Sequence, residues 1–295
     1  IVIVVLGAPN PAFLSPLNIS NTLTFTVELG LIALAMTLLM TSGEFDLSVG
    51  SVFGFTPVLM WTLVNAGGLP LELGFALAML AAMGIGLFNG WFVTRLKIPS
   101  FLVTLGMLLV VRGVALVITD GFPQRTWDSQ DHWLSNLLVG DFRFGGFRFY
   151  ASLFWFAGIA YIMHFVLTKT KAGNWIQASG GNPDAARARG VLVNRTKVWL
   201  FIVSSSMAAL AGVISSIRTS AANPNSGTGY ELDCDGRHRR HRIDGWARFD
   251  HRHGSGCSDL AGHAQRDRSG RRAGPGLQYF YRCYHFGHDG FARLA

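Results

Sequence analysis

The chain has 295 residues, of which half are hydrophobic and only 14% are charged. Soluble domains carry about a quarter charged residues. Together with a mean hydropathy of +0.33, this composition indicates an integral membrane protein and argues against a soluble one. The net charge of +8 lies mostly in residues 234–295, which contain 12 Arg, 6 Asp, all three cysteines and seven of the nine histidines. It therefore does not make residues 1–233 a nucleic-acid-binding domain.

The first seven residues, IVIVVLG, resemble the end of a membrane span. They lack an initiator Met and a basic region, so we expect residues 1–22 to be a truncated span and linker rather than a targeting sequence. Six further segments offer about the 20 apolar residues that a helix needs to cross the hydrocarbon core. They are Leu23–Ser42, Leu47–Asn65, Leu71–Thr94, Pro99–Ile118, Tyr150–Thr168 and Val198–Ile217. The sequence thus predicts an all-α, polytopic transmembrane helix bundle over residues 23–233.

Two basic loops predict the orientation of these spans. Residues 95–98 include Arg95 and Lys97, and residues 169–197 contain six Lys and Arg. The loops are two spans apart, which places them on one face, and an excess of Lys and Arg marks the cytoplasmic face. We therefore expect loops 95–98 and 169–197 to be cytoplasmic in a multi-pass protein of the bacterial inner membrane.

The stretch TSGEFDLSVGS interrupts the apolar pattern between the first two spans. One interpretation is structural: Asp46 caps the second helix and meets the positive end of its dipole, while two glycines allow a tight turn. The other is functional: the stretch is a helix break that lines a polar path, as in transporters with discontinuous helices. The two are compatible. The candidate residues here are Gly43, Glu44, Asp46, Ser48 and Gly50.

Among the polar residues inside the predicted spans, three are candidates for the translocation path. Asn89 interrupts the third span, and Glu28 and Arg112 are predicted at similar depths in the first and fourth. Ionisable groups inside a membrane are functional or paired by default. We hypothesise that Glu28 and Arg112 approach one another; the alternative is that Arg112 snorkels to the outer interface.

Residues 169–197 contain the signals of a short helix. Asn182 can cap it, Pro183 suits the first turn, Asp184 suits the dipole, and Gly190 ends it. Ala185, Ala186 and Ala188 give the helix a small face, and Arg187 lies among them. Such a helix is either a solvated connector or a segment that docks into a groove on a partner.

Four stretches together resemble the permease subunits of bacterial ABC importers of the ribose or simple-sugar type. They are GEFDLSVGS, NGWFVTRLKIPSFLVTLGMLLVVRG, GGNPDAARARGV and AALAGVISSIRTSAANPNSGTGYELD, in the family's order, over residues 20–233. The resemblance implies a helical bundle of about ten spans that pairs with a second permease copy, identical or related. It also implies ATPase subunits beneath the bundle and a periplasmic binding protein that delivers the sugar.

By this resemblance, the segment from Asn182 to Gly190 is the coupling helix that meets the ATPase. The chain has no Gly-x-x-x-x-Gly-Lys-Ser/Thr phosphate loop, so we expect ATP to be bound and hydrolysed by the partner and this chain to need no cofactor. We also expect no metal site and no catalytic residues, because His132 and His164 are isolated in the membrane part. The predicted activity is transport of a monosaccharide or similar small polar solute, not covalent chemistry.

Residues 234–295 form a basic Arg/His/Gly-rich tail with no 18-residue apolar stretch, so they add no membrane helix. A metal-binding role lacks the paired spacing of a zinc site, and a nucleic-acid arm would lie outside the cell. The interpretation we favour is a shift of reading frame. Moved by one base, codons for Arg, Asp and His become codons for residues such as Val, Ala, Ile and Thr, which suit a membrane segment. An out-of-frame tail is expected to be disordered.

Two other functional classes stay open from the sequence. A secondary transporter or channel would use acids within the spans, of which Glu28 and Glu72 are the candidates. A membrane-anchored metal- or nucleic-acid-binding protein would act through residues 234–295. Dependence of transport on an ATPase separates the first class from an importer permease, and zinc or DNA titration of the tail tests the second.

Overall fold

The computed structural model describes residues 15–126, 132–144 and 147–227. All six segments predicted as spans are helices. They are α2 (Pro16–Thr41), α3 (Val49–Asn65), α4 (Leu71–Leu96), α5 (Ser100–Thr119), α7 (Ala151–Lys169) and α10 (Val193–Thr219). Five are long and apolar enough to cross a membrane, whereas α3 has only 17 residues. The predicted all-α polytopic fold is confirmed for the described residues.

The ends of these helices follow from local sequence signals. Ser15 caps α2 by accepting a hydrogen bond from the Asn18 amide, and Pro16 occupies the first turn, where a missing N–H costs little. The α4 helix ends at Leu96, and Lys97 after it adopts a left-handed φ of 55°, two residues before Pro99. A proline at this position disfavours the helical conformation in the residue before it. The α4–α5 connection is consequently short.

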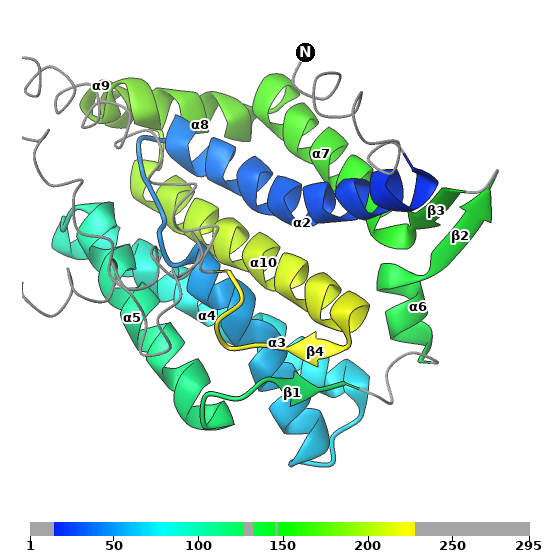
Figure 1. The fold of residues 1–295 in the computed structure, drawn as a ribbon. Coiled ribbons are helices and arrows are strands. Elements are labelled where there is room, and N and C mark those ends of the chain that lie inside the picture. The colour runs from blue at the N-terminus through cyan, green and yellow to red at the C-terminus, as the bar shows by residue number, and fades with distance from the viewer. Residues whose placement is uncertain (1–14, 127–131, 145–146, 228–295) are drawn as a thin grey trace, which may run out of the picture. The chain divides into compact units, whose positions relative to one another are not determined.

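The last long helix, α10, occupies the middle of the bundle. It packs against α4 on one side and against α2 and α3 on the others, while α5 packs on α3 and α4 and α7 packs on α2 (Figure 1). Its surface is correspondingly buried, whereas α4, α5 and α7 expose long apolar faces of the kind that lipid covers. The helix farthest along the described chain thus organises the helices before it.

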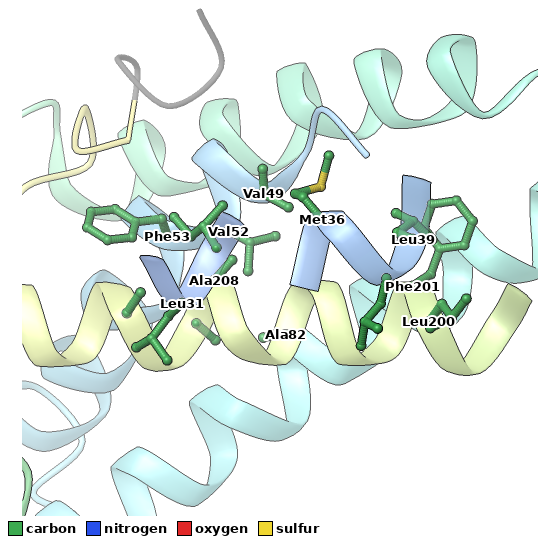
Figure 2. Close-up of a cluster of buried hydrophobic side chains, with 14 of the residues drawn as sticks. Leu31, Met36, Leu39, Val49, Val52, Phe53, Ala82, Leu200, Phe201 and Ala208 are labelled. Atoms are coloured by element: carbon green, nitrogen blue, oxygen red, sulfur yellow. The ribbon is translucent and has the colours of Figure 1, made fainter. Parts of the chain in front are cut away.

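The largest of three clusters of buried apolar side chains lies between α2, α3, α4 and α10 (Figure 2). Its fully buried members include Leu31 and Leu39 from α2, Val52 from α3 and Phe201 from α10. Small residues such as Ala82 and Ala208 lie between the larger ones and let the helices approach closely. This core holds the connection between α2 and α3 inside the bundle.

One end of the bundle gathers the two basic loops predicted to be cytoplasmic. The α2 helix ends there, the α4–α5 loop lies there, and α7 leads there into α8 (Lys171–Gly181) and α9 (Pro183–Ala188) (Figure 1). Two hydrogen bonds join the chain after α2 to the start of α5: the Phe45 amide donates to Ser100 Oγ, and the Leu47 amide donates to Thr104 Oγ1. The shared face of loops 95–98 and 169–197 agrees with the orientation predicted from charge.

The opposite end carries short elements that the hydropathy pattern does not predict. Strand β1 (Gln124–Arg125) pairs antiparallel with β4 (Ala221–Ala222), and β2 (Asp141–Phe144) forms a hairpin with β3 (Phe147–Tyr150). Helix α6 (Trp133–Val139) precedes the hairpin. Trp133 Nε1 donates to Glu72 at the start of α4. These contacts connect the outer ends of the spans to one another.

Candidate functional site

The connection between α2 and α3 enters the bundle rather than turning back at its surface. Gly43 adopts a φ of +83°, which only glycine reaches without strain. From Glu44 to Asp46 the chain is neither helix nor strand. The amides of Phe45 and Leu47 donate to side chains of α5, as described above, which satisfies groups that would otherwise be unpaired in an apolar environment. We call residues Gly43–Ser48 the entry segment.

Asp46 lies at the inner end of the entry segment and is fully buried. Its Oδ1 accepts hydrogen bonds from the Ser48 amide at 2.9 Å and from Ser48 Oγ at 2.6 Å. The predicted cap is thus displaced: Ser48 holds the N-cap position of α3, and Asp46 closes a turn just before it. The carboxylate shapes the start of α3 without being its capping residue.

Asn89 of α4 joins the same network. Its Nδ2 donates to Ser48 Oγ at 2.9 Å, so Asp46, Ser48 and Asn89 form one hydrogen-bonded chain. All three residues have no exposed surface. Asn89 lies seven residues before the end of α4 at Leu96, about 10 Å of helix rise. Sequence reasoning named all three residues, and the structure brings them together.

Three buried side-chain oxygens in and beside the network are unpaired among the described residues. Asp46 Oδ2, Asn89 Oδ1 and Ser205 Oγ have no hydrogen-bond partner among the residues that the structure describes. Ser205 belongs to α10 and faces α4 near Gly86, one turn before Asn89. Leaving a buried polar atom unpaired costs about 1–3 kcal/mol. The centre of the bundle therefore presents hydrogen-bond acceptors that are available to a donor.

The other buried acid is Glu28 of α2, and its ion pair is with Arg218 of α10. Arg218 Nε donates to Glu28 Oε1 at 2.9 Å, and Nη2 lies 2.7 Å from the same oxygen at an angle too poor for a hydrogen bond. The Arg218 guanidinium also lies 4.5 Å from the centre of the Phe25 ring. Arg112, the partner predicted from sequence, lies on α5, which packs against α3 and α4. The structure thus replaces the predicted partner of Glu28 with Arg218.

The predicted short helix in loop 169–197 is present as α9. Asn182 Oδ1 accepts from the amides of Asp184 and Ala185, and Pro183 occupies the first turn. Gly190 follows the helix with a φ of +82°, as expected of a glycine that ends one. Inside the helix Asp184 pairs with Arg187, and Ala186 is buried against the bundle while its neighbours are exposed. The exposed face of α9 points away from the bundle core.

Removing the Asn182 cap gives a local test of α9. We expect Asn182→Ala to destabilise the helix by about 1 kcal/mol, because two amides lose their acceptor. The measurement is amide hydrogen exchange of Asp184 and Ala185, which should accelerate about five-fold. Asn182→Asp retains the acceptor and serves as the control, so acceleration by Asp as large as by Ala would contradict the capping role.

Several site residues were missed by sequence reasoning. Lys197 forms an ion pair with Glu44, and Ser100 and Thr104 hold the entry segment. Their partners are 55 to 153 positions away in the chain. No periodicity or motif links positions so far apart. The one local signal is that Ser and Thr occupy the first turns of α5, where an apolar residue would suit lipid better.

Neither histidine of the described residues belongs to the buried network. His132 caps α6 by accepting from the Leu134 amide, and its Nε2 lies 3.4 Å from Glu72. His164 is exposed on α7, a helix of which Ser152 alone is buried among the described residues. Within the part of the chain that the structure describes, no three His, Cys, Asp or Glu side chains gather as metal ligands would.

The long apolar helices around a buried polar network make this a polytopic membrane protein. Residues 18–234 match the family described as branched-chain amino acid transport system / permease component. The ribose import permease of Escherichia coli strain K12 is 33% identical over 237 residues, which cover 79% of this chain and 72% of that protein. An inner membrane ABC transporter permease of the same strain is 34% identical over 76% of this chain and 67% of that protein.

A third relative, the L-arabinose ABC transporter permease of Azospirillum brasilense, is 34% identical over 75% of this chain and 63% of that protein. No solved structure matches the chain. The chain therefore belongs to the permease family of sugar ABC importers, a family of inner-membrane proteins, as its four sequence motifs indicated. The relatives are permease subunits and not enzymes.

The family match ends at residue 234, beside the change of composition at residue 233. The tail and residues 1–14 lie outside the described residues. The interpretation of residues 234–295 as out of frame therefore stays a hypothesis. Sequencing the gene across codons 231 to 235 tests it, because an extra or missing base should appear there when related genes are aligned; an uninterrupted frame would reject it.

Proposed function

We propose that this chain is the membrane subunit of an ATP-driven importer and forms the translocation path for a monosaccharide. The observation that carries the proposal is the buried network of Asp46, Ser48 and Asn89 at a break between helices. Helix breaks at membrane depth are tolerated where they are buried in protein or line a cavity, and in transporters such breaks form the solute site. A permease family whose named relatives import ribose and L-arabinose supports the same solute class.

The chemistry of the network favours a neutral, hydroxyl-rich solute. Its spare atoms are acceptors, Asp46 Oδ2 and Asn89 Oδ1 among them, and a sugar offers many hydroxyl donors. An amino acid would bring both an ammonium and a carboxylate, and taking two charges out of water costs free energy that a neutral sugar does not incur. The network is closed to solvent in this conformation, so contact with a solute requires the entry segment to move.

The proposed partners follow from the exposed helix at the cytoplasmic end. We assign the ATPase contact to α9 and its flanks, Asn182–Gly190, because this helix is preformed, capped and largely exposed. ATP would bind in the ATPase and not in this chain. A second permease copy, identical or related, and a periplasmic binding protein complete the proposed importer. Gly50, Glu28 and Arg112 remain further path candidates.

The charge of Asp46 gives the sharpest test of a role in the path. In Asp46→Asn, Oδ1 can still accept from the Ser48 amide, but Oδ2 becomes a donor. We expect the folded fraction in membranes to be unchanged and the initial rate of sugar uptake to fall about ten-fold or more, equivalent to about 1.4 kcal/mol. Uptake at the wild-type rate would leave Asp46 with a structural role alone.

The solute class is tested by uptake competition in cells that supply the ATPase and the binding protein. Radiolabelled ribose, arabinose and xylose are offered with a hundred-fold excess of leucine or of each unlabelled sugar. The proposal predicts that one or more sugars enter and compete and that leucine does not. Entry of leucine, or its competition with a transported sugar, would contradict the assignment.

A further inference from the structure

Glu44 and Lys197 form an ion pair at the cytoplasmic end of the bundle. Glu44 belongs to the entry segment, and Lys197 lies in the first turns of α10, just after α9 and its flank. Only 15% of the Lys197 side chain and 13% of the Glu44 side chain are exposed. A pair so shielded holds its partners more firmly than an exposed one, and removal of one partner leaves the other charge uncompensated.

A second contact ties the α8–α9 unit to the same stretch of chain, whereas the ion pair reaches this stretch from the start of α10. Gly180, near the end of α8, lies against the backbone of Thr41 and Ser42 at the end of α2. A Cβ at Gly180 would collide with the Thr41 carbonyl, and the Gly180 backbone also lies beside Gly43. At the neighbouring Gly181, by contrast, a Cβ would meet no atom of the described residues within 4 Å. The α8–α9 unit is thus seated closely on the entry segment's first residues.

The entry segment is also hydrogen-bonded to helices inside the bundle. Beyond Glu44, Phe45 and Leu47 are bonded to α5, and Ser48 is bonded to Asn89 of α4. A displacement of α8 and α9 would therefore act on the entry segment at Gly43 and Glu44. The segment in turn is tied to the helices that surround the buried acceptors. A single chain of contacts runs from α9 to Asn89.

We propose that Glu44, Lys197 and Gly180 form a joint that transmits movement of α8–α9 to the entry segment. The proposal rests on α9 being the ATPase contact, as assigned above. Glu44 and Lys197 are then positioning residues: they bind neither solute nor ATPase but keep the two parts moving together. Without the joint, ATP hydrolysis would continue while the entry segment no longer followed it.

The first test needs no partner and uses the full chain in lipid nanodiscs. Hydrogen exchange is measured at the Phe45 and Leu47 amides, which are bonded across to α5. We expect Gly180→Ala to accelerate both about ten-fold and its matched control Gly181→Ala to leave them unchanged. No acceleration in Gly180→Ala, or equal acceleration in both variants, would overturn the seating of α8 on the segment.

The ion pair is tested by exchange of charges. Glu44→Gln and Lys197→Met should each accelerate exchange at Phe45 and Leu47 about five-fold, and the swap Glu44→Lys with Lys197→Glu should restore at least half of the protection. Asp184→Asn, which breaks the exposed pair with Arg187, should leave these amides unchanged. Failure of the swap to restore protection would overturn the pairing role.

The transmission itself is tested in the assembled importer. In Glu44→Gln, co-purification of the ATPase should be unchanged, while ATP hydrolysed per sugar imported should rise at least five-fold. Loss of ATPase binding would make Glu44 a docking residue, and an unchanged ratio would show no transmission; either result overturns the proposal. If the wild-type chain binds no ATPase, the proposed function fails, whatever the exchange experiments show.

Discussion

Replacing Gly86 by Ala is expected to destabilise the bundle by about 1–3 kcal/mol, which is the typical cost of overpacking a core. Gly86 of α4 faces α10, and a Cβ there would lie 2.5 Å from the Phe201 carbonyl oxygen and 2.8 Å from Ile202 Cα. Both are backbone atoms, so no side-chain rotation relieves the clash. The two helices must separate instead, and the cost should appear as a shift of the SDS unfolding midpoint in mixed micelles.

The same helix provides the control. Gly84 lies two residues earlier, is exposed, and has nothing within 4 Å of a Cβ. Alanine is favoured over glycine in a helix interior by about 1 kcal/mol, so Gly84→Ala should be neutral or slightly stabilising. The two substitutions are chemically identical, and opposite signs isolate the effect of the α4–α10 contact. Equal shifts in both variants would contradict the packing described for α10.

Among substitutions that remove one charged side chain, those that break the buried Glu28–Arg218 pair should lower the free energy of unfolding most. We expect Glu28→Gln and Arg218→Met each to cost about 3–5 kcal/mol, because each leaves an uncompensated charge or an unpaired polar group in a low-dielectric site. The pair replaced together, Glu28→Met with Arg218→Met, should cost much less than the sum of its single changes. The coupling energy is obtained from SDS unfolding of the double variant and of its two single changes, Glu28→Met and Arg218→Met.

The exposed pair of α9 is the comparison for this cycle. Asp184 and Arg187 have side chains that are 92% and 52% exposed, so their coupling should be below about 1 kcal/mol. If the Glu28–Arg218 cycle gave a coupling as small as that of the Asp184–Arg187 cycle, the buried pair would not hold α2 to α10. A large coupling also identifies Arg218, rather than Arg112, as the energetic partner of Glu28.

Sequence patterns predicted the spans and the short helix well because both depend on local chemistry. Apolar length determines a membrane helix, and the Asn182-Pro183-Asp184 order determines where α9 begins. The break after Thr41 was equally visible, since polar residues interrupt an apolar run. How far the chain enters the bundle after this break could not be predicted from the sequence. The chain beyond Gly43 enters the bundle because side chains of α4 and α5 satisfy its backbone and polar groups, and those helices come later in the sequence.

The pairing of charges shows the same limit. Depth along each span suggested Arg112 for Glu28, but depth says nothing about which helices are neighbours. Helix α10 packs on α2, so Arg218 reaches Glu28. In the same way Lys197, which counted only as a basic loop residue, pairs with Glu44 across the molecule. Tertiary neighbours decide these partners, and a single sequence without them offers alternatives that cannot be ranked.

ATP dependence of uptake tests the central claim, that this chain is an importer permease, most directly. Proteoliposomes containing the full chain and its ATPase, supplied with the sugar-loaded binding protein, are energised either by ATP or by a proton or sodium gradient alone. An importer permease should accumulate labelled sugar with ATP and none with the gradients. Accumulation driven by a gradient without ATP, or without the ATPase, would contradict it and would make the chain a secondary transporter.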